Sequence, residues 1–300
     1  MIPPCRHCMR GEPQNVDISD ADIDAVLAQT EKILLLRFGG GEPLMALDRM
    51  QYTLDRIQAR NIPLLGLYLV TNAIAVTDTA LKLIKDYRIF IDACRAVYEA
   101  ANGPLYYEPV FVHVSQDRYH REHDDGRGFR GYVKLIDSLY RYARVAKIEG
   151  GNTPAAIGLA KQLPAEETQA RNPIPQHMVN MAEIAVCDAD HIPSCPVNKN
   201  LHDMLDPGEQ IVCCDVVLTA RGNIVNQYVA DDEYVTEDVP GNIICRASDD
   251  IWCSILKYNV GKMSCADYNS FIAKLGRTGP QATHHNPINA ILNLAKKMKG

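Results

Sequence analysis

Ile33-Leu34-Leu35-Leu36-Arg37-Phe38 is a short apolar run, and Gly39-Gly40-Gly41-Glu42-Pro43 follows it directly. A run of this length that ends in consecutive glycines predicts a buried β-strand followed by a glycine-rich turn. Leucines and methionines at helical spacing come next, which predicts a helix over 47–60. The stretch therefore begins a strand-then-helix unit, and the rest of the chain shows whether that unit repeats.

The alternation continues for about 110 residues. Further strands are predicted at 63–70, 108–115 and 144–149, with helices at 78–100 and 132–142 between them. An earlier helix starts near residue 20, with Ser19 as its N-cap and Asp20 and Asp22 in its first turn. The segment 124–128 is expected to be a solvated loop. Repeated units of this kind predict an α/β fold with a parallel sheet or barrel and right-handed connections.

The pattern changes after about residue 180. The run 211–218, a turn at Gly222-Asn223 and Ile224-Val225 predict an antiparallel hairpin. Two helices are expected near 249–258 and 265–275, before a tail rich in Gly, Pro and His. The expected divisions of the chain are 1–182, a hairpin-containing extension over 183–248, and C-terminal helices and tail over 249–300.

Composition narrows the possible partners. Of the 300 residues, 47% are hydrophobic and 23% charged, which is typical of a globular chain with a packed core. A net charge of -6 and a pI near 5.8 argue against nucleic acid or an anionic membrane surface as the partner. No run of 18 apolar residues and no apolar signal core occur, so we expect a cytoplasmic protein whose partner is a small molecule or a protein.

The chain has ten cysteines, and a reducing compartment makes metal or redox chemistry the better explanation of any tight cysteine spacing. One such spacing occurs, Cys5-Arg6-His7-Cys8, which lets two thiolates reach one metal ion or cluster. A thioredoxin-like pair, half of a zinc site and coincidence remain open on spacing alone. For the cysteines beyond residue 180, buried thiols are favoured over an auxiliary metal site.

The glycine-rich turn lacks the spacing of a dinucleotide site and the lysine of a phosphate loop. Its glycines let the backbone approach a ligand closely, and Glu42 places a carboxylate beside exposed amides. The alternative is an ordinary turn ahead of a helix.

Together, the Cys-x2-Cys pair and the Gly-Gly-Glu-Pro turn, in this order and about one helix apart, resemble the radical S-adenosylmethionine (SAM) superfamily. That family carries Cys-x3-Cys-x2-Cys, whose three thiolates bind a 4Fe-4S cluster that chelates SAM through its remaining iron. The resemblance implies Cys5 and Cys8 as cluster ligands. It also implies contacts to SAM from the turn, namely from Gly40, Gly41, Glu42 and Pro43.

Two further segments support the resemblance. Thr71-Asn72-Ala73 stands where relatives often have Thr-Asn-Gly, and Ser115-Gln116-Asp117 is similar to a Ser-x-Asp segment of one branch. Thr71, Asn72, Ser115 and Asp117 are therefore expected at the cofactor site, at the carboxyl ends of parallel strands. For Ser115 and Asp117 the alternative is a cap on the following helix.

The resemblance covers residues 1 to about 180 and implies a partial (β/α)6 TIM-like barrel lacking its first strand, with a small α+β extension. It implies reductive cleavage of SAM to a 5'-deoxyadenosyl radical that abstracts hydrogen from a small-molecule or peptide substrate. Flavodoxin or ferredoxin is the implied electron donor.

Position 1, where the first cysteine of the triad would fall, is Met1. A truncated start is the simplest explanation. The alternatives are a cluster-free remnant or binding protein, a substitute ligand, and a zinc-binding module that uses Cys5 and Cys8.

Overall fold

The computed structural model describes two compact units, Met1–Arg171 and Asn172–Gly300. Within them it describes residues 6, 8, 15–122, 124–148, 158–167, 184–187, 211–214, 216–225, 243–251 and 254. Among these residues, no helix combines the length and the apolar character that crossing a membrane requires.

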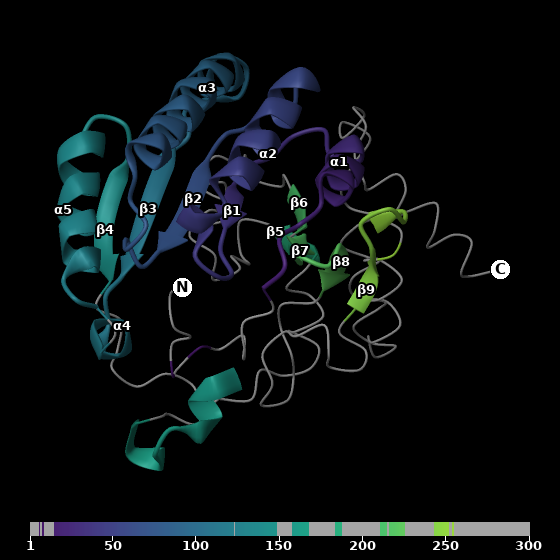
Figure 1. Ribbon diagram of the computed structural model, residues 1–300. Helices are drawn as coiled ribbons and strands as arrows, with labels where there is room; N and C mark the ends of the chain where they lie inside the picture. Colours follow the sequence, from purple (N-terminus) through teal and green to yellow (C-terminus); the bar gives the residue numbers. More distant parts are fainter. Residues whose placement is uncertain are drawn as a thin grey trace. The chain divides into compact units, whose positions relative to one another are not determined.

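The first unit is built on a four-stranded parallel sheet, which confirms the predicted α/β class (Figure 1). Its strands are β1 (Leu36–Phe38), β2 (Leu67–Thr71), β3 (Val110–Ser115) and β4 (Arg144–Ile148), and they lie side by side in chain order. The registers include Leu36 with Leu67 and Leu67 with Val110. Four strands in a row do not by themselves make a closed barrel.

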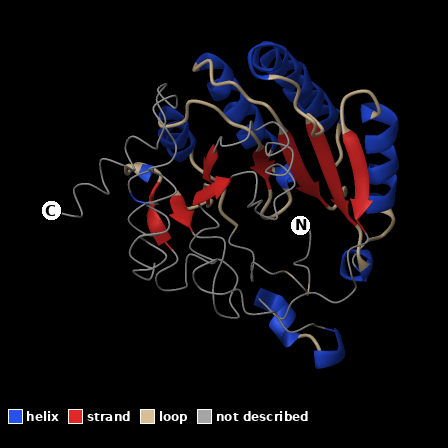
Figure 2. Ribbon diagram, turned by 180° about the vertical axis from the view of Figure 1, so that it is seen from behind, coloured by secondary structure: helices blue, strands red, loops and turns tan. Residues whose placement is uncertain are grey.

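Helices connect and flank these strands. They are α1 (Asp20–Ala28), α2 (Leu47–Ala59), α3 (Asp78–Asn102), α4 (Arg118–Glu122) and α5 (Arg127–Leu139), with 3₁₀ turns η1 (Pro43–Met45), η2 (Gly158–Gln162) and η3 (Ala165–Glu167). The predicted cap of α1 is confirmed, because the Ser19 hydroxyl accepts a hydrogen bond from the amide of Asp22. Figures 1 and 2 show α2, α3 and α5 along one face of the sheet.

Two boundaries differ from the predictions. The first strand begins at Leu36 rather than Ile33, because the carbonyl of Leu34 accepts the hydroxyl of Tyr107 and the chain bends there. Ile33 forms only an isolated bridge with Leu64. Helix α5 begins at Arg127 rather than Tyr132, so the expected loop over 124–128 is partly wrong.

The glycines of α5 explain that early start. A methyl group at Gly131 would lie 1.8 Å from the carbonyl oxygen of Ala73, and one at Gly128 would lie 3.0 Å from that of Asn72. The helix therefore packs directly against the loop after β2. Glycine has a low helix propensity, so the sequence alone does not predict the first turn of α5.

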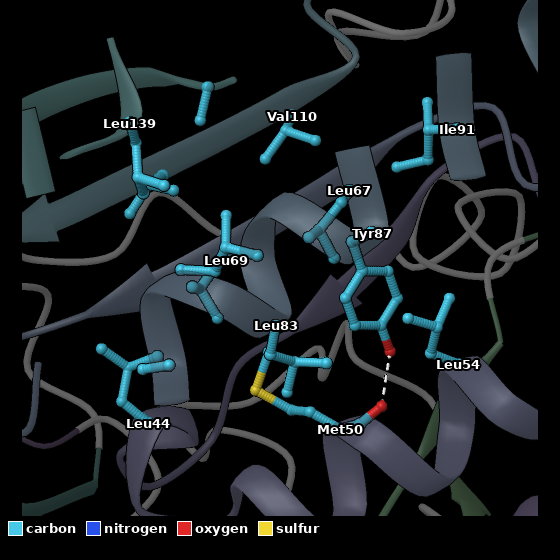
Figure 3. Packing of buried hydrophobic residues seen from close by; sticks show 14 of the residues in the cluster. Leu44, Met50, Leu54, Leu67, Leu69, Leu83, Tyr87, Ile91, Val110 and Leu139 are labelled. Carbon is cyan, nitrogen blue, oxygen red and sulfur yellow. Dashed lines mark hydrogen bonds between the residues drawn. The ribbon is translucent and has the colours of Figure 1, made fainter. Parts of the chain in front are cut away.

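The core of the first unit lies between the sheet and helices α2, α3 and α5 (Figure 3). Leu67, Leu69 and Val110 supply apolar side chains from the strands, and all three are fully buried. Tyr87 of α3 is also fully buried, and its hydroxyl donates a 2.7 Å hydrogen bond to the carbonyl of Met50 in α2. This bond gives the buried hydroxyl of Tyr87 a partner, while the ring of Tyr87 packs in the apolar core.

The second unit contains two antiparallel sheets. One pairs β5 (Ile184–Cys187) with β6 (Ile211–Cys214), and the other joins β7 (Val217–Leu218), β8 (Asn223–Val225) and β9 (Ile243–Arg246). The hairpin is confirmed only for β7 and β8, with Gly222 at a φ of 75° in its turn. Residues 211–214 pair instead with β5, so the single strand expected over 211–218 is wrong.

Several other expectations for the second unit fall outside the described residues. Ile251 and Ser254 are helical, which agrees with a helix near 249–258, whereas 265–275 and the tail are not described. Cys245 is buried, as expected of a later cysteine.

Candidate functional site

The polar residues expected at a site follow the carboxyl ends of β1, β2 and β3. Because the strands are parallel, these ends lie at one edge of the sheet, where α/β proteins bind ligands (Figure 1). The loop over 39–43 follows β1, Thr71 ends β2, and Ser115 ends β3. The topology therefore places all three predicted segments at the same edge.

Glu42 joins the first two segments. One carboxylate oxygen accepts hydrogen bonds from the Thr71 hydroxyl at 2.6 Å and from the amide of Leu44 at 3.1 Å. The other accepts the amide of Asn72 at 2.8 Å. Burial raises the pKa of Glu42, although the hydrogen bonds from Thr71, Asn72 and Leu44 oppose the rise. Glu42 thus ties the glycine-rich loop to the end of β2.

The loop around Glu42 has the backbone that its sequence suggests. Gly40 has a φ of 128°, which only glycine adopts readily, and Pro43 opens the 3₁₀ turn η1. Gly40 and Gly41 are exposed. Their peptide groups therefore remain accessible to a ligand.

The end of β2 forms a tight polar turn. The Thr71 hydroxyl accepts the amide of Ala73, and the Asn72 side-chain oxygen accepts the amide of Ile74, both at 2.9 Å. Ala73 has a φ of 61°, where glycine is favoured. The turn explains why a Thr-Asn-Gly sequence suits this position and why Ala73 is strained in it.

Asp117 caps α4, in agreement with the alternative prediction for this residue. Its Oδ1 accepts the amides of Tyr119 and His120, at 3.0 and 3.1 Å, and lies 2.9 Å from Nδ1 of His120. His120 is near enough to Glu42 to lower the pKa of that carboxyl. The cap therefore brings an imidazole beside the other polar groups at this edge.

Ser115 and Asn72 line the same small, open hollow at this edge of the sheet. Its other lining residues are Ile74, Gln116, His120, Arg121 and Asp124.

A row of large side chains crosses the sheet face opposite α2, α3 and α5. Arg37 lies over Tyr68 at 5.2 Å, Tyr68 stacks on Phe111 at 5.3 Å, and Arg144 lies over Phe111 at 5.8 Å. The registers of neighbouring strands pair these four residues in sequence. The result is a cation–π row that runs from β1 to β4.

His113 connects this row to the polar edge. Its Nδ1 lies 2.7 Å from the Tyr68 hydroxyl. Burial, followed by the nearby Arg37 and His120, lowers the pKa of His113, whereas burial raises that of Tyr68. The lowered pKa favours the neutral imidazole, which shares this hydrogen bond with the phenol in a direction set by its tautomer.

The N-terminal cysteine pair is described only at Arg6 and Cys8. Arg6 forms ion pairs with Glu122 of α4 at 3.4 Å and with Glu167 at 3.8 Å. The carbonyl of the half-buried Cys8 accepts the amide of Leu159 at 2.9 Å. Arg6 therefore lies beside α4, the helix that follows β3, whereas Cys5 lies outside the described residues.

In the described part of the chain, no three His, Cys, Asp or Glu side chains gather closely enough to hold a metal ion. Sequence reasoning did not single out Gln116 or the pairing of Tyr68 with His113. Burial of a glutamine and contacts between neighbouring strands depend on register, which no local motif encodes.

Comparison with protein-family models gives no match, and comparison with curated proteins gives no match either.

Proposed function

We propose that this chain is a radical SAM enzyme, which cleaves SAM reductively and uses the resulting radical to abstract hydrogen from a small-molecule or peptide substrate. One observation carries the proposal. The Arg6–Glu122 ion pair brings Arg6 beside α4, at the same sheet edge where Glu42 fastens the glycine-rich loop to Thr71 and Asn72. A residue between the two cysteines and the glycine-rich loop at one sheet edge supports the proposal.

The strand order supports a partial (β/α)6 barrel. Right-handed connections between strands in the order β1-β2-β3-β4 place the connecting helices on one face. A doubly wound sheet would reverse its order at a switch point, and no reversal occurs among these four strands. The face with Tyr68, Phe111 and His113 would then line the inside of the barrel.

The donor set suits an iron–sulfur cluster in type, because thiolates are the preferred ligands of such clusters. Within the sequence, Cys5 and Cys8 are the two cysteines of the motif, and the family's cluster needs a third thiolate. When bound, the cluster would supply the electron for SAM cleavage, and flavodoxin or ferredoxin would supply electrons to the cluster.

The residues at the sheet edge would have different roles in binding SAM. All three hydrogen bonds to Glu42 come from the protein, so this residue would position the loop. The exposed peptide groups of Gly40 and Gly41 would then face the amino group of SAM. Ser115 would offer a hydroxyl, and Asp117 would hold His120 in place.

Anaerobic reconstitution with iron and sulfide tests the proposal. Two proteins are compared: the 300-residue chain, and a Met1→Cys variant of it preceded by an added initiator methionine, which completes the cysteine spacing of the family. The proposal expects a 4Fe-4S absorption spectrum and reductive formation of 5'-deoxyadenosine in the restored protein. Cys8→Ser in the restored background is the matched loss-of-ligand control.

Other outcomes would favour the alternatives. Zinc uptake without iron would support a zinc-binding module that uses Cys5 and Cys8. A folded protein that takes up neither metal in either form would support a cluster-free remnant or binding protein.

A further inference from the structure

Helix α5 carries a row of four large apolar side chains that are exposed, which we call the α5 stripe. It consists of Phe129, Val133, Ile136 and Tyr140, whose exposed fractions lie between 37% and 67%. Tyr140 directly follows the helix and keeps helical backbone angles, so the four side chains lie in line. Their spacing of four, three and four residues is that of a coiled-coil seam. A contiguous apolar row of this kind marks an interaction surface.

The α5 stripe faces away from both the core and α3. Leu135 and Leu139 are fully buried and form the core side of the helix. Lys134 pairs with Asp78 of α3 at 2.7 Å, and it lies about 100° round the helix from Val133. Figure 1 shows α5 as the last helix of the row formed by α2, α3 and α5, beside β4. The stripe is therefore open on the side where this row of helices ends.

One charged residue of each sign flanks the α5 stripe. Arg130 directly follows Phe129, and Asp137 directly follows Ile136, so both charges lie on the same flank. Both residues are exposed, and neither belongs to an ion pair within the described part of the chain. This flank is self-complementary, because its positive end can meet the negative end of an identical helix that runs in the opposite direction.

We propose that the α5 stripe binds the same stripe of a second copy of this chain, with the two helices antiparallel about a two-fold axis. An axis between Val133 and Ile136 sets Val133 of each copy against Ile136 of the other, and Phe129 against Tyr140. Stable interfaces use about 20–30 residues a side, so this short seam gives a weak dimer that dissociates on dilution. The dimer goes beyond the proposed function, because it depends on neither a cluster nor SAM.

Charge favours the antiparallel direction over the parallel one. The two-fold axis brings Arg130 of each copy beside Asp137 of the other, which makes two ion pairs across the dimer. Two parallel helices would place their charged flanks on opposite sides of the seam, where neither pair can form. The order of the charges along α5 therefore selects one arrangement of the two copies.

Sedimentation velocity of the 300-residue chain, in a series from about 1 to 500 μM, tests the proposal. A reductant excludes disulfide-linked dimers, because the chain has ten cysteines. The wild type should shift reversibly from monomer to dimer. Val133→Glu and Ile136→Glu place carboxylates in the seam and should each weaken association at least tenfold. Ile89→Glu, at a 61% exposed position of α3 outside the stripe, should associate as the wild type does.

Charge reversal tests the direction of the two helices. Arg130→Glu alone brings like charges together across the seam, and so does Asp137→Arg alone. Each variant by itself should therefore associate about threefold more weakly or worse. An equimolar mixture of the two variants restores opposite charges at both ends of the seam, so mixed dimers should form about as tightly as those of the wild type.

Four results would overturn the proposal. The first is a monomer throughout the concentration series, and the second is association that survives both Val133→Glu and Ile136→Glu. The third is a mixture of charge-reversed variants that associates no better than either variant alone. The fourth is a lowered Tm of Val133→Glu at about 1 μM, where the dimer has dissociated, because a segment of the same chain would then cover the stripe. Cluster assembly is not involved, so failure here leaves the reconstitution experiment unaffected.

Discussion

The hydroxyl of Thr71, at the end of β2, donates a 2.6 Å hydrogen bond to the carboxylate of Glu42, in the loop after β1. Thr71 is only 2% exposed, so the bond lies away from water and joins two segments that are 29 residues apart. The same carboxylate accepts the amide of Asn72. The geometry of the loop at this sheet edge therefore depends on one acidic side chain.

Glu42→Gln should destabilise the protein, because an amide group has one oxygen and cannot accept all three hydrogen bonds that the carboxylate accepts. Leaving a buried donor unsatisfied costs about 1–3 kcal/mol, and we expect the free energy of unfolding in urea to fall by that amount. Asp86→Asn, in the surface pair with Lys82, is the matched control and should cost less than about 0.5 kcal/mol. Equal effects of the two substitutions would contradict the role given to Glu42.

Gly131→Ala should disrupt the contact between α5 and the loop after β2. The added methyl group would lie 1.8 Å from the carbonyl oxygen of Ala73, which is backbone and cannot move aside alone. Overpacking of this kind costs about 1–3 kcal/mol, and we expect the upper end of this range in urea unfolding. At Gly39 the nearest atom is 3.8 Å away, so Gly39→Ala should cause no comparable loss.

Tyr87→Phe measures how much one buried hydrogen bond contributes to the stability of the core. The substitution removes the hydroxyl that donates to the carbonyl of Met50 and leaves the ring in place. We expect the free energy of unfolding to fall by about 1 kcal/mol. Tyr140, which is 67% exposed, provides the comparison, because Tyr140→Phe should change stability by less than about 0.5 kcal/mol. If Tyr87→Phe leaves the free energy of unfolding unchanged, the hydrogen bond does not stabilise the fold.

His113 should make stability sensitive to mild acid. Its pKa is lowered from an ordinary value of 6.5, so the unfolded chain binds the proton more readily than the folded one. The stabilising contribution is therefore complete above pH 6.5 and is lost as the pH falls through the lowered value. His113→Gln keeps a side chain that can donate to or accept from the Tyr68 hydroxyl, but it does not titrate.

Unfolding free energies measured between pH 5 and 8 check this expectation. Wild type should lose more stability than His113→Gln on the acid side of this interval. Parallel pH profiles for the two proteins would show that His113 does not contribute to the acid sensitivity.

The strand-and-helix order was predictable because it depends on local periodicity. Apolar runs at β2, β3 and β4 and the Ser19 cap are visible in short windows of sequence, and the structure confirms each of them. The start of α5 was not predictable in this way. Gly128 and Gly131 are poor helix formers, but the loop after β2 approaches them too closely for a larger residue. That approach depends on the tertiary structure.

The candidate site, too, could be predicted only in part from the sequence. Motif spacing pointed to Glu42, Thr71 and Asn72, and the structure joins these three by hydrogen bonds. The sequence offered two roles for Asp117, contact with a ligand and a cap on the following helix, and it gave no sign that Gln116 is buried. Those features depend on how the chain continues after β3 in three dimensions.

The order of the four parallel strands also has a consequence for how the protein is made. Each strand from β2 to β4 pairs with the strand that precedes it in the chain. On the ribosome, the earlier partner of each strand has therefore already been synthesised when that strand emerges. The sheet can grow by one strand and one covering helix at a time, without waiting for a distant segment, and domains commonly fold from the N-terminal side during synthesis.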